Sequence, residues 1–278
     1  MKIAVTGASG FIGKHIVAEL ERQSIVPVLT SRREHGVHAA GSKPGVVRLD
    51  IRNPPEDAFE RLGRPDVLIH LAWGGLPHYA SLHHFEDELP AHYRFLKGLI
   101  AAGLSNLLVA GTCLEYGMQS GQLDEELDAR PVVPYGFAKD GLRRELQYLQ
   151  QTVPFKLTWA RLFYLLGDGQ AESSLLPLLR SAVSRGDQSF DMSGGEQLRD
   201  YLPATEMARI LVSLATKARN NGIVNVCSGD PISVRRLVEN HIERNGWSIK
   251  LNLGYYQYPN YEPMAFWGDR RKLTDCLK

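Results

Sequence analysis

A chain of 278 residues that is 44% hydrophobic and 23% charged can bury a full core, and we expect one domain with a smaller lobe. Its 32 basic and 31 acidic residues nearly cancel, so charge does not suggest nucleic acid or an anionic membrane as a partner. The three cysteines form no CxxC pair, and no apolar run has membrane-spanning length. These features favour a soluble, cytoplasmic protein that acts on a small molecule and holds no metal.

The first predicted unit is a strand, a glycine-rich turn and a helix. The short apolar run over residues 3–5 leads into Gly7, Gly10 and Gly13, and apolar residues then recur at helical spacing. Glycines let the backbone approach a pyrophosphate closely, and a helix N-terminus offers it free N–H groups. The spacing is GxxGxxG, and its place after a first strand favours a dinucleotide site over a plain turn. The predicted cofactor contacts here are Gly7, Ser9, Gly10, Phe11, Ile12 and Gly13.

The second predicted strand, residues 25–29, is followed by a basic segment. In sites that bind NAD, an acidic residue usually stands here and holds the hydroxyls of the adenosine ribose. Arginine instead matches a 2′-phosphate in both charge and donor geometry. We therefore predict NADP(H) in preference to NAD(H), bound by Ser31, Arg32 and Arg33. A solvated basic turn is the alternative, and it suits Arg33 better than Arg32.

The third and fourth predicted strands, residues 46–49 and 66–69, are nearly uniformly apolar, as buried parallel strands are. Residues that follow such strands face the ligand crevice of a doubly wound sheet. We expect Asp50 and Ile51 beside the adenine, and Leu71, Ala72 and Trp73 near the nicotinamide half. His70 is expected to be a packed or hydrogen-bonded core residue.

The segment 73–93 is rich in aromatic and acidic residues and contains four histidines, His78, His83, His84 and His92. Their spacing matches no pattern of metal ligands. We expect a solvated, irregular loop that leads into a helix over residues 90–102. A substrate contact from His78 or Tyr79 is an alternative.

A hydroxyl, a phenol and an ammonium are predicted to meet at the crevice. Thr112 follows the fifth predicted strand, residues 106–110, while Tyr135 and Lys139 share one face of a helix predicted over 135–149. An ammonium beside the phenol would pull the tyrosine pKa from ~10 towards neutrality. Such a trio can bind a carbonyl oxygen and protonate it as hydride arrives. Taken alone, the Tyr135 and Lys139 pair also fits an ordinary surface helix.

Together these motifs resemble the extended short-chain dehydrogenase/reductase family, which contains nucleotide-sugar epimerases, dehydratases and ketoreductases. The resemblance spans nearly the whole chain in family order. It is carried by Gly7-xx-Gly10-xx-Gly13, His70-Leu-Ala72, Thr112 with Tyr116-Gly117, Tyr135-xxx-Lys139, Arg161-Leu-Phe163 with Gly167, Arg199-Asp-Tyr201, and Trp267-Gly-Asp269 with Lys272.

This resemblance implies an α/β fold. A Rossmann domain with a doubly wound parallel sheet would occupy residues 1–165, with residues 198–228 packing back on it. A smaller C-terminal α/β lobe, residues 166–278, would bind a nucleotide diphosphate sugar. The resemblance also implies that Thr112, Tyr135 and Lys139 are the catalytic trio, that the lysine bonds the nicotinamide ribose, and that subunits pair as a homodimer through helices 90–102 and 135–150.

The resemblance further implies substrate contacts from Thr112, Cys113, Tyr164, Leu176, Arg180, Phe190 and Arg199. Here the helix over 175–183 and the segment 189–192 would wrap the nucleotide base, with Phe190 either stacked on it or in the core. Arg199 would pair with the diphosphate, and a salt bridge to a neighbouring acid is its alternative. The loop over 255–263 would cover the sugar nucleotide; it has no arginine, and Arg180 is the candidate to compensate.

Departures from the family pattern narrow the reaction. Family 4,6-dehydratases carry an Asp-Glu pair after the catalytic threonine, whereas Cys113 and Leu114 stand here, so dehydration is disfavoured. Epimerase-reductases that make deoxysugars use a cysteine and a histidine beside the active site. The matching position for the cysteine is Leu114, with Cys113 one residue away, so we give that activity a small share. Tyr164 replaces a family asparagine, and another asparagine is missing around Ala91, so the substrate is less defined than the fold.

We therefore predict NADPH-dependent reduction of the 4-keto group of a nucleotide-linked 4-keto-6-deoxyhexose. The specific expectation is conversion of dTDP-4-keto-6-deoxyglucose to dTDP-D-fucose, in the biosynthesis of deoxysugars for polysaccharides such as O-antigen. One alternative is an NAD-dependent nucleotide-sugar 4-epimerase. An alternative of another class is a catalytically silent, dinucleotide-sensing regulatory protein, although such relatives usually lack the Tyr/Lys pair that is intact here.

Overall fold

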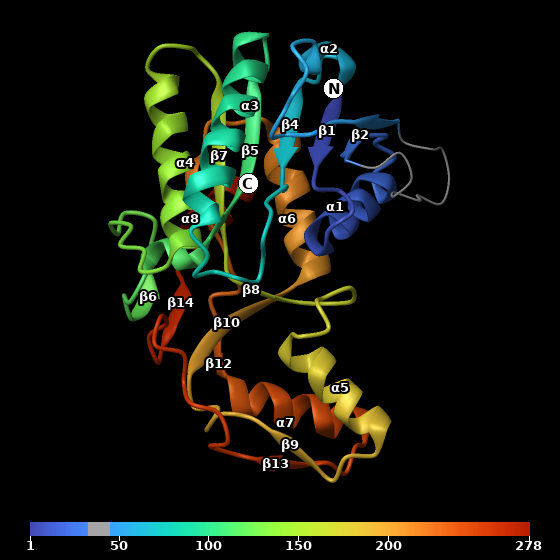
Figure 1. Ribbon diagram of the computed structural model, residues 1–278, viewed down its shortest axis with the longest axis vertical. Helices are drawn as coiled ribbons and strands as arrows, with labels where there is room; N and C mark the ends of the chain where they lie inside the picture. Colours follow the sequence, from blue (N-terminus) through green and yellow to red (C-terminus); the bar gives the residue numbers. More distant parts are fainter. Residues whose placement is uncertain (33–44) are drawn as a thin grey trace.

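A seven-stranded, wholly parallel sheet forms the centre of the molecule (Figure 1). The structure is a computed structural model that describes residues 1–32 and 45–278. The sheet order is β11-β7-β5-β4-β1-β2-β3. Its strands are β1 (Ile3–Thr6), β2 (Val28–Ser31), β3 (Val46–Arg48), β4 (Val67–His70), β5 (Asn106–Thr112), β7 (Lys156–Leu162) and β11 (Gly222–Val226). The chain winds outward in both directions from β1, which confirms the predicted doubly wound α/β fold and puts the ligand crevice between β1 and β4.

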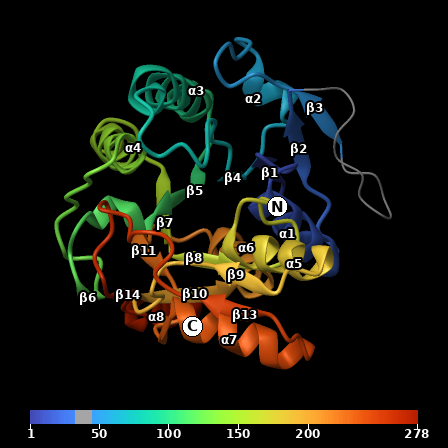
Figure 2. The same cartoon turned by 60° about the horizontal axis from the view of Figure 1, so that its bottom comes forward.

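Helices cover both faces of this sheet, as Figure 2 shows. In β5, Leu108 and Ala110 join one apolar cluster, whereas Leu107 and Val109 join the cluster on the other face, because successive strand residues point to opposite sides. This burial on both faces explains the uniformly apolar strands. The first cluster includes α1 (Phe11–Arg22), α6 (Ala204–Lys217) and α8 (Arg271–Leu277), and the second includes α2 (Ala58–Arg61), α3 (Leu89–Ala101) and α4 (Pro134–Gln150).

A smaller α/β lobe lies beyond the C-terminal edge of the sheet, at the bottom of Figure 1. Its apolar cluster includes Leu179, Phe190 and Val238. Its elements are β8 (Tyr164–Leu166), α5 (Leu175–Arg185), β9 (Ser189–Asp191), β10 (Leu198–Pro203), β12 (Pro231–Ser233), α7 (Val234–Asn245) and β13 (Lys250–Asn252). A separate two-stranded pair, β6 (Gly121–Leu123) with β14 (Phe266–Gly268), lies beside it. After β10 the chain returns to the main sheet, where α6 packs on α1 and β11 pairs with β7. None of the helices described is long and apolar enough to cross a bilayer.

Several element boundaries differ from the sequence-based expectations for physical reasons. The second strand begins at Val28 instead of Ile25, because the Ile25 N–H bonds to Leu20 O in the turn that ends α1. The fifth strand continues to Thr112, because Gly111 and Thr112 still pair with β7. A π-helical turn, η1 (His84–Glu88), precedes α3 where a loop was expected.

Candidate active site

The turn between β1 and α1 brings the backbone of Gly7 against the end of β4. Gly7 has a φ of +73°, and a Cβ there would lie 2.7 Å from the backbone N of Ala72. A Cβ on Gly13 would lie 2.2 Å from the carbonyl oxygen of Gly7. Both positions therefore need glycine, and the tight turn leaves the N-terminus of α1 facing the crevice.

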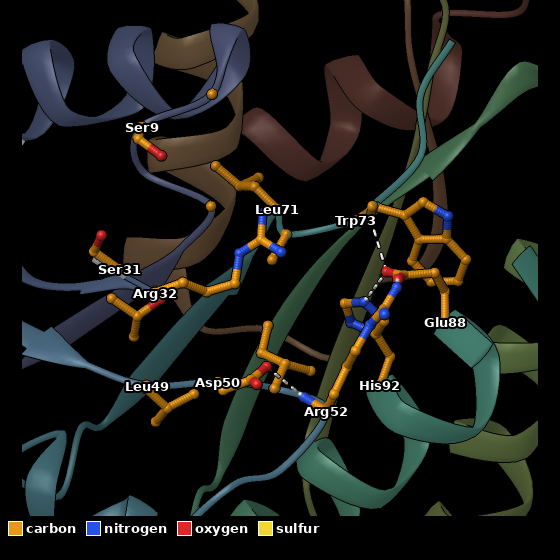
Figure 3. Close-up of a pocket in the computed structure, with 16 residues that line it drawn as sticks. Ser9, Ser31, Arg32, Leu49, Asp50, Arg52, Leu71, Trp73, Glu88 and His92 are labelled. Carbon is orange, nitrogen blue, oxygen red and sulfur yellow. Dashed lines mark hydrogen bonds and ion pairs between the residues drawn. The ribbon is translucent and has the colours of Figure 1, made fainter. Parts of the chain in front are cut away.

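A cavity of about 320 Å³ opens beside this turn, between the ends of β1, β2 and β4 (Figure 3). Among the predicted cofactor residues, those that line it are Gly7, Ser9, Gly10, Ser31, Arg32, Asp50, Ile51, Leu71, Ala72 and Trp73. Gly13 is buried within α1, Phe11 and Ile12 line a second cavity, and Arg33 lies outside the described residues. A glycine turn with Ser31 and Arg32 at the far side of the cavity fits a dinucleotide.

A directed chain of hydrogen bonds leads from β1 to the same cavity. His92 Nε2 lies 3.1 Å from the Glu88 carboxylate, which can only accept, so this nitrogen carries the proton. His92 Nδ1 must then accept from His70 Nε2 at 2.7 Å, and His70 Nδ1 must accept from Thr6 Oγ1 at 2.8 Å. His70 is fully buried, as predicted, and burial lowers the pKa of both imidazoles, which keeps them neutral.

Glu88 is the acceptor at the end of this chain. Its carboxylate also accepts the N–H of Gly74 at 2.7 Å and forms an ion pair with Arg52, whose side chain runs beside His92 towards Glu88 in Figure 3. Burial acts to raise the pKa of Glu88, but the hydrogen bonds from His92, Arg52 and Gly74 outweigh it and hold the pKa well below its usual range. Glu88 is therefore charged, which agrees with its acceptor role.

The sequence-based expectation of a solvated loop over residues 73–93 is wrong for two of its histidines. His84 and His92 are 0% and 3% exposed. The Trp73 indole N–H donates to His84 Nδ1 at 3.1 Å, and the Trp73 ring is stacked on His92. Both histidines lie in helices, His84 in η1 and His92 in α3, where tertiary contacts bury their side chains, and residue spacing does not reveal such contacts. Arg52, Glu88 and His92 were consequently missed as residues of the cavity.

Two members of the predicted catalytic trio meet in a second cavity of about 230 Å³. Thr112 ends β5 and caps the short 3₁₀ helix η2 (Cys113–Tyr116). Its hydroxyl accepts the N–H of Leu114 at 3.3 Å. Tyr135 is the second residue of α4, which begins at Pro134. Both side chains line the cavity, so the structure places a hydroxyl and a phenol together at the end of a central strand.

Lys139, the third member, is 2% exposed and lies one turn further along α4. Its Nζ donates to Ala110 O at 2.9 Å and stands 4.0 Å from the ring centroid of Trp73. Burial lowers the pKa of Lys139 to about 7, although the negative charges of Glu115 and Glu88 act to raise it.

The pKa of Tyr135 is shifted in the direction opposite to the sequence-based expectation. Burial raises it above its usual value, and the hydrogen bond with Thr112 opposes this only in part. The Lys139 ammonium lies 5.9 Å from the Tyr135 ring centroid. The spacing of the two residues indicated a shared face but not the loss of solvent, which dominates here.

Thr112 is held by a buried carboxylate that sequence reasoning missed. Glu115 is 0% exposed and its Oε1 accepts the backbone N–H of Thr112 at 2.9 Å. It also accepts the indole N–H of Trp159 at 2.9 Å and forms an ion pair with Arg161 at 2.7 Å. The contact with Thr112 is a local capping box, whereas Trp159 and Arg161 lie on β7, so no local pattern indicates these two partners.

The predicted substrate contacts lie in three different environments. Cys113 and Tyr164 line the second cavity, and burial raises the pKa of the Cys113 thiol. Leu176 and Phe190 lie in the apolar core of the lobe, which for Phe190 is the alternative stated above. Arg180 is exposed and lies 3.8 Å from Asp168.

Arg199 also adopts its alternative arrangement. It is 3% exposed, and its guanidinium donates to Glu262 at 3.0 Å. Glu262, which accepts the Tyr164 hydroxyl at 2.5 Å, comes from the loop over 255–263 and lines the second cavity. Sequence reasoning placed this loop over the substrate but did not single out its glutamate. Within the described ranges, no group of His, Cys, Asp or Glu side chains could hold a metal ion.

The parallel sheet and the glycine turn beside the first cavity define a protein of the Rossmann dinucleotide-binding class. The chain belongs to the NAD dependent epimerase/dehydratase family, whose model matches residues 3–227, and this confirms the resemblance to the extended short-chain dehydrogenases/reductases.

Named relatives in this family act on nucleotide sugars. Over 271 residues the chain is 29% identical to the dTDP-6-deoxy-L-talose 4-dehydrogenase (NAD(+)) of Aggregatibacter actinomycetemcomitans, with 96% of this chain and 99% of that protein covered. It is 27% identical to the dTDP-6-deoxy-L-talose 4-dehydrogenase (NAD(P)(+)) of Kitasatospora kifunensis, with 88% and 79% covered. A solved structure of MoeE5 in complex with UDP-glucuronic acid and NAD matches with a TM-score of 0.82 and 25% identity, over 100% of this chain and 92% of that one.

Proposed function

We propose that this protein is an NADPH-dependent reductase of the 4-keto group of a nucleotide-linked 4-keto-6-deoxyhexose. The observation that carries the proposal is the second cavity, where the hydroxyls of Thr112 and Tyr135 lie together and the one carboxylate among the lining residues, Glu262, is paired with Arg199. Cys113 and Leu114, which would have to be carboxylic acids for dehydration, are buried and apolar. Two relatives named for a 4-dehydrogenase of dTDP-6-deoxy-L-talose support chemistry at the same carbon.

In this proposal each residue of the trio has a separate role in the reduction of a carbonyl group. NADPH, when bound, supplies the hydride. Tyr135 gives its proton to the carbonyl oxygen as that oxygen becomes an alkoxide, and Thr112 donates a hydrogen bond to the same oxygen. Burial raises the pKa of Tyr135, so the phenol is protonated at neutral pH, which is the state that a reduction needs. Lys139 is proposed to hold the nicotinamide ribose.

NADP(H) is the proposed coenzyme because Arg32 and Ser31 line the far end of the first cavity. The proposed substrate carries a nucleotide diphosphate that extends into the C-terminal lobe, and dTDP-4-keto-6-deoxyglucose, which would give dTDP-D-fucose, is the substrate to test first. We further propose a cytoplasmic homodimer that pairs through α3 and α4. The exposed side chains of Phe137 and Tyr148 on α4 agree with such pairing.

Purified protein should oxidise NADPH when it receives a dTDP-, GDP- or CDP-linked 4-keto-6-deoxysugar. The absorbance of NADPH measures the rate, and NMR of the product identifies the configuration at C4. Tyr135→Phe should lower the rate by about 10²–10⁴-fold, because the proton donor is lost. If none of these ketosugars consumes NADPH, the proposal is wrong.

A 4-epimerase that keeps NAD bound is the second candidate, and a relative named UDP-glucose 4-epimerase, 23% identical over 86% of this chain, favours it. Denaturing the purified protein and identifying the released cofactor separates the two. Tightly held NAD with formation of the C4 epimer and no net NADPH oxidation indicates the epimerase. For a silent, dinucleotide-sensing protein, Tyr135→Phe should instead leave every measurable activity unchanged.

A further inference from the structure

We propose that Trp73 is a positioning residue for Lys139: its indole ring is held in a fixed orientation, with one face against the buried ammonium. The proposal rests on the role given above to Lys139. Trp73 follows β4 and lines the first cavity, and its ring centroid lies 6.1 Å from that of Tyr135, which lines the second.

The contact itself is a cation–π interaction in a dry environment. Lys139 Nζ lies 4.0 Å from the ring centroid of Trp73, and the lysine is 2% exposed. Ala110 O accepts one of its three N–H groups at 2.9 Å. A desolvated ammonium gains more from an aromatic face than an exposed one, and tryptophan offers the strongest face. The indole ring thus takes the place of part of the water that Lys139 has lost.

The hydrogen-bond chain described above anchors the backbone on both sides of Trp73. The N–H of Ala72 points to Thr6 Oγ1 at 3.5 Å, at one end of the chain. The N–H of Gly74 donates to Glu88 at 2.7 Å, at the other end. The two histidines that join these ends are neutral and buried, so both anchors belong to one rigid unit.

The indole ring is fixed in the same way. Its plane is stacked on His92 with 4.6 Å between centroids and 20° between planes, and its N–H donates to His84 at 3.1 Å. Figure 3 shows the side chain of Trp73 beside Glu88 and His92 at the edge of the cavity. Trp73 is therefore restrained by the hydrogen bonds of the flanking backbone, by the stacking of its ring on His92 and by the hydrogen bond of its indole N–H. A residue that only filled space would not need all three restraints.

The charged and titratable groups that face Lys139 come from five elements. They are Tyr135 on α4, Glu115 on η2, Glu88 and His84 on η1, His92 on α3 and His70 on β4. The two glutamates favour the ammonium form, whereas burial opposes it. Loss of the indole face removes one stabilising contact and leaves these groups in place, so the proton on Lys139 should be held less tightly.

The proton affinity of Lys139 can be measured without substrate or coenzyme. Protein labelled with ¹³C at the lysine Cε positions is titrated by NMR, and the Lys139 signal is assigned by its absence in Lys139→Met. The wild-type midpoint is expected near the pKa of about 7. Trp73→Leu should lower the midpoint by about 0.5–1.5 pH units, which corresponds to the loss of one cation–π contact.

Two further variants keep the experiment decisive. Trp73→Phe retains an aromatic face and should shift the midpoint less than Trp73→Leu. Trp247→Leu removes a tryptophan that packs against His241 in the C-terminal lobe and should leave the midpoint unchanged. A Lys139 midpoint that stays constant or rises in Trp73→Leu and Trp73→Phe would overturn the proposal, because Trp73 would then only exclude water. Since the NMR titration needs no turnover, its outcome is separate from that of the reductase assay.

Discussion

The hydrogen bond between His70 and His92, with 2.7 Å between Nε2 and Nδ1, can run in one direction only. The acceptor at the end of the chain is a charged carboxylate, so every proton in the chain points towards Glu88. Such a chain tolerates a replacement only if the new side chain both donates and accepts.

His92→Leu should therefore destabilise the protein more than His92→Gln. Leucine leaves the His70 N–H and one lone pair of Glu88 without a partner, and we expect a loss of about 2–4 kcal/mol in the free energy of unfolding. Glutamine can donate and accept, so its loss should be smaller. Urea denaturation measures both. Equal losses for the two variants would mean that packing, not hydrogen bonding, is what His92 provides.

The buried histidines should also make the protein sensitive to acid. Burial lowers the pKa of His70 and His92 in the folded state, whereas both titrate near 6.5 when unfolded. Below about pH 6.5 the unfolded chain then binds more protons, so stability falls as the pH falls and is fully present above that value. His92→Gln removes one such group and should flatten the slope by up to about 1.4 kcal/mol per pH unit. An unchanged slope between pH 6.5 and 5 in urea denaturation would contradict this.

Lys139→Met should stabilise the protein while it abolishes the proposed reaction. The pKa of Lys139 is about 7 in the folded chain and 10.5 in the reference state, so the unfolded chain binds more protons between these values. Stability of the wild type therefore rises with pH across this window, and the advantage of the methionine variant is largest below pH 7 and shrinks above it. Urea denaturation of both proteins at several pH values between 6 and 9 tests this. A constant difference between the two would show that Lys139 is not desolvated.

Glu115→Leu should be more damaging than the loss of the whole ion pair. The single change leaves the Arg161 guanidinium buried without its carboxylate, which typically costs about 3–5 kcal/mol. In the double variant Glu115→Leu/Arg161→Leu no charge is left unpaired, so we expect it to be more stable than the single variant. The free energies of unfolding in a double-mutant cycle measure this. Additive losses would argue against a direct pairing.

Arg32→Ala should change coenzyme preference. Loss of a charge-assisted contact with the 2′-phosphate should lower kcat/KM for NADPH by about 10–100-fold and leave NADH almost unaffected. Arg61→Ala is a matched control, since Arg61 is also exposed but lies on α2, where it pairs with Asp57. Equal effects of Arg32→Ala on both coenzymes would remove the case for NADP(H).

Sequence alone predicted the features that local patterns specify. The glycine turn at Gly7 follows from backbone constraints, apolar residues at helical spacing indicated α4, and uniformly apolar runs indicated the strands. It could not predict the burial of His84 and His92 or the contacts of Glu115 with Trp159 and Arg161, because these depend on tertiary packing between different elements. The direction of the Tyr135 pKa shift was missed for the same reason, since residue spacing contains no information on solvent exclusion.

The contact between Gly7 and Ala72 makes the two halves of the site interdependent. Ala72 packs against the glycine turn through its backbone, and the next residue is the tryptophan that touches Lys139. A glycine turn transplanted from another family member would therefore disturb the alignment of Lys139 unless residues 72–74 came with it. Protein engineers who wish to exchange the coenzyme should accordingly begin at the end of β2, which lies outside this shared segment.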